Sequence, residues 1–221
     1  MRDFAQPKVM TSAAVAAAIT VLACYPQLAL WPARPHMLWI LEAILFPCAY
    51  VLWGFVFAWH TRYSGRPIFP AKIGYRLLAG AIFGGLAAGE IPHFCFDPIL
   101  RQKLPGEYPV NLLQWSAMTL FTLAFQQLFL LFAPFAFFAR LFRSDRAAIH
   151  LTVFFGVVVV LLKMNSTAAM LPPWLSVGLV VTRVLTGFLA LYFYLRGGIF
   201  LIFCWSLMIQ LRHLPDLLGW S

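Results

Sequence analysis

Residues 110–138 read VNLLQWSAMTLFTLAFQQLFLLFAPFAFF, and this stretch decides the class of the fold. It contains no charged residue, and it exceeds the roughly 20 residues that a helix needs to cross a bilayer. Its apolar residues are continuous and do not alternate with polar ones, which argues against a strand of a transmembrane barrel. The stretch therefore predicts a membrane-spanning helix, either one long tilted helix or one broken near Pro134.

Two glutamines, Gln126 and Gln127, lie next to each other in the middle of this stretch. Each carboxamide brings two donors and an acceptor into hydrocarbon, where unpaired polar groups are costly. We therefore expect the pair to find partners on neighbouring helices or to belong to a site.

The whole chain has the composition of a membrane protein. Of its 221 residues, 62% are hydrophobic and only 10% are charged, whereas soluble domains carry roughly 25% charged residues. The sequence predicts an all-α, polytopic bundle that forms a single integral membrane domain over residues 1–221, with an eighth span as the alternative to seven. The predicted spans are Thr11–Leu28, Met37–Phe57, Ile73–Ile91, Val110–Phe138, Ala147–Leu162, Trp174–Phe193 and Gly197–Leu211.

The basic residues predict the orientation of these spans. With a cytoplasmic N-terminus, ten fall on the cytoplasmic side: Arg2, Lys8, Arg62, Arg66, Lys72, Arg76, Arg140, Arg143, Arg146 and Arg196. Five fall on the other side: Arg34, Arg101, Lys103, Lys163 and Arg212. We expect these side chains to meet lipid headgroups and not nucleic acid. A bacterial inner membrane fits the short loops and the basic bias.

The remaining connection of some length is Pro92–Pro109, which carries turn residues and four charges. We expect a plain loop, with a small folded extramembrane cap as the alternative. The four cysteines show no spacing typical of a metal site, and we interpret them as packing residues.

Two charged residues lie inside predicted spans. Glu42 is flanked by apolar residues in the second span, and Arg183 lies within the sixth. An ionisable residue in a membrane is a functional candidate by default. We predict that the two form a structural ion pair, because a proton or substrate path would need a further carboxylate at depth.

Small residues and one E-x-x-H pattern distinguish the third span. Gly80, Gly84, Gly85 and Gly89 have the small-xxx-small spacing that lets helices approach closely. We expect them to pack within this chain, with a partner-binding face as the alternative. Glu90 and His93 form E-x-x-H once only, with Pro92 inside it, whereas di-iron sites need the pattern twice. No metal site is predicted.

The fourth span is rich in phenylalanine, and Phe121, Phe125, Phe129 and Phe132 share one helical face. A bound lipid, pigment or quinone could lie along that face, but lipid contact or ordinary helix packing is the interpretation that we favour. No cofactor is predicted.

Residues 121–211 present features in an order that resembles the CAAX-protease and bacteriocin-processing family of intramembrane proteases. That family carries E-E-x-x-x-R on one span, F-x-x-x-H on the next, and a histidine with an asparagine four residues later on the last. The corresponding stretches here are residues 124–131 (AFQQLFLL), 154–159 (FFGVVV) and 195–210, which begins Leu-Arg-Gly-Gly and ends Ser-Leu-Met-Ile-Gln.

The resemblance places a different residue at every catalytic position. The family's glutamate pair falls on Gln126 and Gln127, its arginine on Leu131, and its first histidine on Val159. Its second histidine and its asparagine fall on Ser206 and Gln210. A carboxamide cannot act as a general base, and valine cannot bind a proton or orient water. The resemblance therefore implies a pseudoenzyme, in which the polar replacements form a neutral interhelical network.

These observations lead to one principal hypothesis and two alternatives. We expect a non-catalytic membrane protein that acts as a scaffold or accessory subunit and contacts other membrane protein subunits. A divergent intramembrane protease would have to use Glu42, Glu90 or His93. A small transporter component would line its path with Glu42 and Arg183, but paired broken helices in two related halves are missing.

Overall fold

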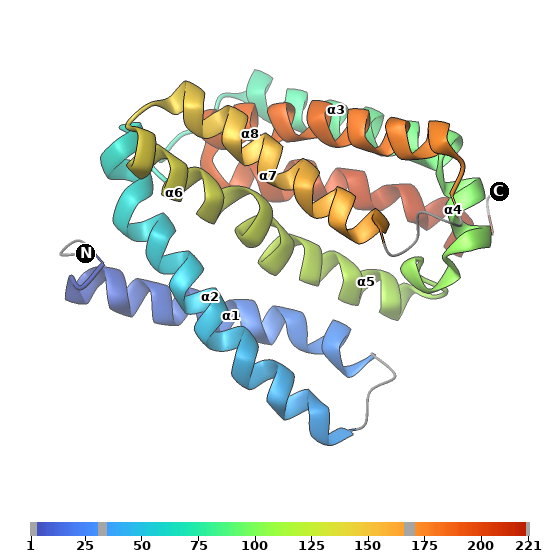
Figure 1. The fold of residues 1–221 in the computed structure, drawn as a ribbon, viewed down its shortest axis with the longest axis horizontal. Coiled ribbons are helices and arrows are strands. Elements are labelled where there is room, and N and C mark those ends of the chain that lie inside the picture. The colour runs from blue at the N-terminus through green and yellow to red at the C-terminus, as the bar shows by residue number, and fades with distance from the viewer. Residues whose placement is uncertain (1–3, 31–34, 166–170, 220–221) are drawn as a thin grey trace. The chain divides into compact units, whose positions relative to one another are not determined.

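A computed structural model describes residues 4–30, 35–165 and 171–219 of the chain. All regular elements within these residues are helical (Figure 1). Six of the helices are long and apolar enough to cross a membrane: Pro7–Ala29, Met37–Ser64, Tyr75–Cys95, Leu112–Phe142, Asp145–Met164 and Pro173–Leu217. The chain is thus a multi-pass helical membrane protein, as its composition predicts.

The last of these helical stretches contains two arms. The helix α8 (Pro173–Gln210) leaves helical geometry at Gly198, where φ is 63° and ψ is −159°. Glycine adopts this backbone conformation without the steric cost that a Cβ would impose. The chain turns back on itself there, as the orange and red parts of the ribbon show (Figure 1). The predicted spans Trp174–Phe193 and Gly197–Leu211 fall on these two arms.

The chain divides into two compact units. The first comprises Met1–Ile68 and Leu113–Ala148, and the second comprises Phe69–Leu112 and Ile149–Ser221. The first unit therefore holds α1 (Pro7–Ala29), α2 (Pro35–Ser64) and nearly all of the long helix that ends with α6 (Ala133–Phe142). The second holds α3 (Tyr75–Cys95), most of α7 (Asp145–Asn165) and α8.

In the first unit, α2 packs against both α1 and α6. A buried hydrogen bond joins α1 to α2, because Trp53 Nε1 donates to Thr20 Oγ1 at 2.9 Å. The same Trp53 ring lies 6.2 Å from the ring of Phe132 in the long helix. The polar contact satisfies both groups where no water is available, and the aromatic contact supplies apolar burial.

In the second unit, α3 packs against the second arm of α8 through its small residues. A Cβ added at Gly85 would lie 2.6 Å from the backbone oxygen of Trp205, and one at Gly89 would lie 3.1 Å from that of Ile209. Glycine is therefore required at Gly85 for the observed approach of the two backbones. Gly80 and Gly84 lie farther from their neighbours, with the ring of Phe193 at 3.8 Å from each added Cβ.

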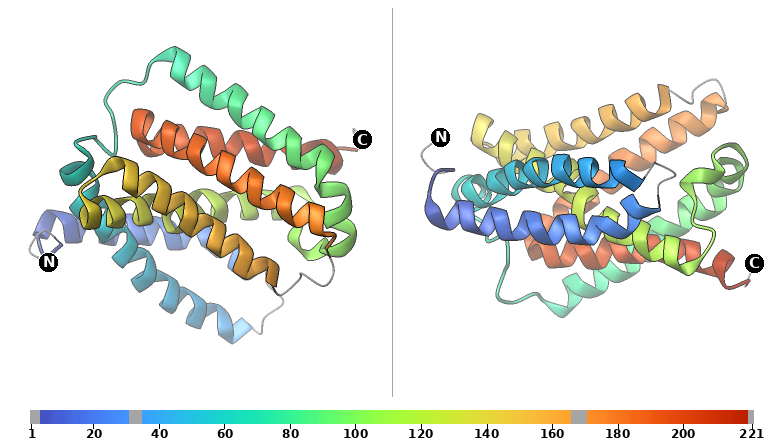
Figure 2. Two further views of the ribbon diagram at one scale, coloured as in Figure 1. Left: turned by 45° about the horizontal axis from the view of Figure 1, so that its top comes forward. Right: turned by 90° about the horizontal axis from the view of Figure 1, so that it is seen from below.

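The first arm of α8 runs antiparallel to α7. Three contacts establish this direction: Gly156 with Arg183, Val153 with Gly187, and His150 with Phe188. As the residue number falls along α7, it rises along α8, and the two helices lie side by side in opposite directions (Figure 2).

The segment after α3 is folded, and the expectation of a plain loop was wrong. It forms α4 (Asp97–Lys103) and the short 3-10 helix η1 (Pro105–Glu107). Pro98 stands at the beginning of α4, where its missing N–H costs nothing. Phe96 is buried with Leu171 and Leu175 at the beginning of α8. This apolar contact holds the folded segment of residues 97–108, here called the cap, against the beginning of α8 within the second unit.

Candidate functional site

The glutamine pair lies in a helix with unusual hydrogen bonding. After α5 (Leu112–Phe121), the backbone forms two π-helical stretches, η2 (Thr122–Gln126) and η3 (Leu128–Phe132), and then continues without interruption into α6. The N–H of Gln127 donates to the carbonyl of Thr122, and the N–H of Ala133 donates to that of Leu128. Each bond spans five residues and not four, which widens the helix.

Pro134 gives a physical reason for the wide turns. A proline inside an α-helix has no N–H to offer the carbonyl four residues earlier, and its ring clashes with that carbonyl. The carbonyl in question belongs to Leu130, within η3. A wide turn at η3 accommodates this clash, whereas η2 lies too far from Pro134 for the same explanation. The helix continues past Pro134 without the break that was one of the two expectations for this span.

The side chains of the widened segment differ in how exposed they are. Gln126 is exposed, and its carboxamide makes no hydrogen bond within the described residues of its unit. Gln127 is half-buried and makes contacts of its own. Leu131, at the position where the family resemblance would place an arginine, is buried. One carboxamide is therefore available near the middle of an apolar span.

The other positions suggested by the resemblance belong to the second unit. Val159 is half-buried on α7, Ser206 is buried on the second arm of α8, and Gln210 is half-buried at the end of that arm. Ser206 and Gln210 both make contacts. None of these side chains offers a carboxylate or an imidazole, so they supply no general base. Whether they act together with the glutamine pair stays a prediction.

The two charged residues inside spans lie in different units. Glu42 is half-buried on α2 in the first unit, and Arg183 is half-buried on the first arm of α8 in the second. The guanidinium of Arg183 lies against Gly156 of α7, where an added Cβ would be 2.6 Å from its Nη2. The ion pair between Glu42 and Arg183 stays a prediction.

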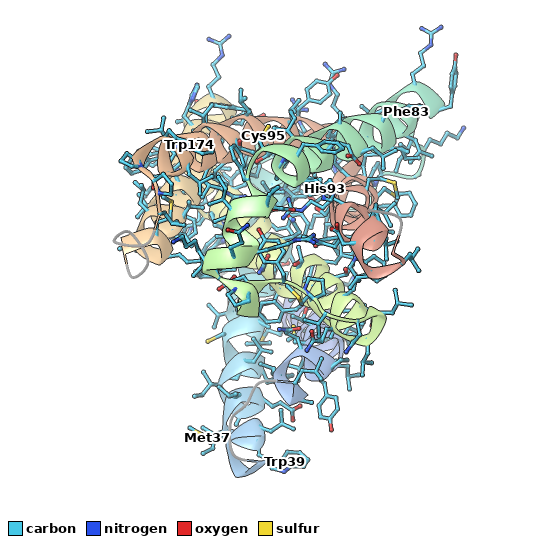
Figure 3. All side chains as sticks on the ribbon, turned by 90° about the vertical axis from the view of Figure 1, so that its right-hand side faces the viewer. Met37, Trp39, Phe83, His93, Cys95 and Trp174 are labelled. Carbon is cyan, nitrogen blue, oxygen red and sulfur yellow. The ribbon has the colours of Figure 1, made fainter. Side chains whose placement is uncertain are left out.

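Glu90 and His93, the two residues of the E-x-x-H pattern, lie in different environments. Glu90 is exposed, whereas His93 lies under the cap, with its Nδ1 at 3.7 Å from Asp216 Oδ2 of the C-terminal segment (Figure 3). Within the described residues, no group of three or more His, Cys, Asp or Glu side chains could hold a metal ion.

His93 belongs to a cluster of charged residues that the sequence did not predict. Asp97 begins α4, and its side chain is only 3% exposed. Its Oδ1 accepts a hydrogen bond from the Tyr108 hydroxyl at 2.8 Å, and its Oδ2 lies 3.4 Å from Nε of Arg212. Arg101, one turn further along α4, donates to Asp216 in the short C-terminal helix α9 (Leu214–Leu217). Two ion pairs thus join the cap to the end of the chain.

Two rings complete this cap cluster. Tyr108 meets the ring of His213 edge to face at 5.7 Å, and the guanidinium of Arg101 lies over the Tyr108 ring. Burial, followed by the charge of Asp97, raises the pKa of Tyr108 above its ordinary value. Arg212 Nε donates to His213 Nε2 at 3.3 Å, so the proton of a neutral ring lies on Nδ1.

The charges of the cap cluster favour a structural role. Its two arginines balance its two aspartates, and each carboxylate is engaged by an arginine. Several buried polar atoms nevertheless have no hydrogen-bond partner within the described residues, among them Asp97 Oδ2, His93 Nδ1 and His213 Nδ1. Ordered water commonly satisfies such groups.

The phenylalanine face of the long helix is continuous. The rings of Phe121 and Phe125 lie 5.7 Å apart, and those of Phe125 and Phe129 are stacked at 6.0 Å. Phe132 is fully buried against Trp53, whereas Phe129 is exposed. The exposed part of this face adjoins Gln126 in the sequence, and the binding of a lipid, pigment or quinone there stays a prediction.

No protein-family model matches this chain, and no curated protein and no solved structure matches it.

Proposed function

We propose that the protein is a non-catalytic, multi-pass membrane protein that acts as a scaffold or accessory subunit and binds a membrane-spanning segment of another protein. The observation that carries this proposal is the exposed carboxamide of Gln126 near the middle of the 31-residue helix Leu112–Phe142. Lipid chains can neither donate to nor accept from a carboxamide, so an unpaired one is costly at that depth. A polar group on a neighbouring helix removes the cost, and interhelical hydrogen bonds are a common means of association in membranes.

The chemistry of the positions that resemble the protease family supports a non-catalytic role. Gln126 and Gln127 have no accessible protonation change, and Val159 has no polar atom. Hydrogen bonding is what these side chains retain. A degenerate, protease-like bundle that binds a segment without cleaving it is therefore the function that we infer.

Purification from native membranes tests this proposal. We would express the tagged full chain and its Gln126→Leu variant, extract both in a mild detergent, and measure mass and partner stoichiometry. We expect the wild-type chain to carry a membrane protein at a fixed ratio and the variant to lose most of it. Leu120→Ala, at an exposed apolar position on the same helix, is the matched control and should keep the partner. A monodisperse wild-type monomer without any partner would contradict the proposal.

A further inference from the structure

Arg183 is a charged side chain at mid-depth in the second unit. It lies about 15 Å along α8 from Pro173, at 1.5 Å per residue, which is half of a hydrocarbon core of about 30 Å. Gly156 lies at a similar depth, about 16 Å along α7 from Asp145. Charge at this depth is expensive and is normally paired.

The Arg183 side chain packs at a defined place but has no ion-pair partner among the described residues of its own unit. Gly156 leaves room for the guanidinium, because an added Cβ would lie 2.6 Å from Nη2 and 2.8 Å from Nε. None of the ion pairs among the described residues of the second unit includes Arg183. The acidic residues of that unit are occupied elsewhere or exposed: Asp97 and Asp216 in the cap cluster, Glu107 with Lys163, and Glu90 at the surface.

We propose that Arg183, seated on Gly156, is a receptor site for one carboxylate carried by a membrane-spanning helix of a partner protein. The fork of the guanidinium binds a carboxylate through two parallel hydrogen bonds. Lipid headgroups lie at the bilayer surface, about 15 Å from this depth, so a phosphate is a poor candidate. The inference rests on the proposed function, which supplies a partner helix, and it adds that this helix carries an Asp or Glu at mid-membrane.

A designed peptide serves as the probe. It is an apolar Leu/Ala helix of about 20 residues with a single central glutamate, and its control has glutamine at the same position. The purified full chain and each labelled peptide are placed together in phosphatidylcholine vesicles, and association is measured by energy transfer. We expect the glutamate peptide to bind about tenfold more tightly than the glutamine peptide, a difference typical of one charge-assisted contact.

Variants assign the preference to the site. Arg183→Met should reduce the ratio of the two affinities to about one, whereas Arg183→Lys should keep part of it. Gly156→Val should also lower the ratio, because its side chain would occupy the seat of the guanidinium. Val177→Ala, on an exposed face of the same arm, should leave the ratio unchanged. Thermal unfolding of each variant measures whether the fold is retained. Arg183→Lys provides the test if Arg183→Met does not fold.

Two results would overturn the inference. The first is equal binding of both peptides by the wild-type chain and by its Glu42→Gln variant. The second is a preference that exists only after Glu42→Gln, since the one carboxylate of this chain deep within a span would then be the natural occupant. Loss of the native partner in Gln126→Leu, together with equal peptide affinities, would retain the proposed function and reject the Arg183 site alone.

Discussion

Individual residues carry the polar chemistry of this apolar chain, and Tyr108 shows how strongly burial acts on it. Its hydroxyl donates to Asp97 within the cap cluster, outside the membrane-spanning helices. Burial and the neighbouring carboxylate both disfavour the tyrosinate. The pKa of Tyr108 is therefore higher in the folded state than in the unfolded state. Folding therefore gains stability from the neutral hydroxyl below about pH 10, and it loses this stability as the pH rises further.

This reasoning predicts the alkaline titration of Tyr108. The ultraviolet difference spectrum between the wild-type chain and Tyr108→Phe should place the ionisation of Tyr108 above pH 10. Asp97→Asn should move the step to lower pH, because it removes the negative charge beside the hydroxyl. Tyr75→Phe, at an exposed position, should leave the step of Tyr108 unchanged. A step at or below the ordinary value would contradict the burial of the hydroxyl.

At the scale of the elements, the turn at Gly198 determines how α8 folds back. The backbone there has φ 63° and ψ −159°, a combination that is essentially restricted to glycine. We predict that Gly198→Ala lowers the free energy of unfolding by about 1–3 kcal/mol. The control is Gly74→Ala, because Gly74 has a φ of −65° and no atom within 4 Å of an added Cβ. Thermal unfolding in detergent, followed by circular dichroism, measures both, and equal melting of the two variants would argue against this turn.

The elements differ in how far the sequence predicts them. The spans are predictable because each is a long apolar run. The spacing of Gly85 and Gly89 predicts a close helix contact, but not that the second arm of α8 makes it. The π-helical stretches are not predictable in the same way, since their composition matches that of any apolar helix and Pro134 is the single local signal. The cap cluster depends on pairs such as Arg101 and Asp216, which are 115 residues apart. No local pattern identifies such a pair, although the charges of Pro92–Pro109 indicated that this segment was unusual.

The whole molecule has an orientation that its basic residues predict. Ten lysines and arginines on one side of the predicted spans, against five on the other, predict a cytoplasmic N-terminus. If both arms of α8 cross the membrane, the C-terminus lies on the opposite side. Reporter fusions at the two ends measure this directly: a fluorescent protein that folds only in the cytoplasm should be active at the N-terminus, and a phosphatase that needs the oxidising side should be active at the C-terminus. A fluorescent N-terminal fusion together with an inactive phosphatase at the C-terminus would place both ends on the cytoplasmic side and favour an even number of spans.

The widened helix affects which residues of α6, the helix that follows it, face the interior. Each bond over five residues, such as that from Gln127 to Thr122, adds one residue to a turn that an α-helix would complete without it. In effect the segment holds surplus residues without forming a loop. Removing one of them between Thr122 and Phe132 would return one π-helical stretch to ordinary α pitch and leave the direction in which α6 faces unchanged. Keeping all the residues in an unbroken α-helix would instead rotate α6 relative to α5 by about 100° for each surplus residue, the angle per residue in an α-helix. By absorbing the surplus residues, the wide turns therefore keep Phe135 and Ala136 buried while Gln126, on the same helix, is exposed.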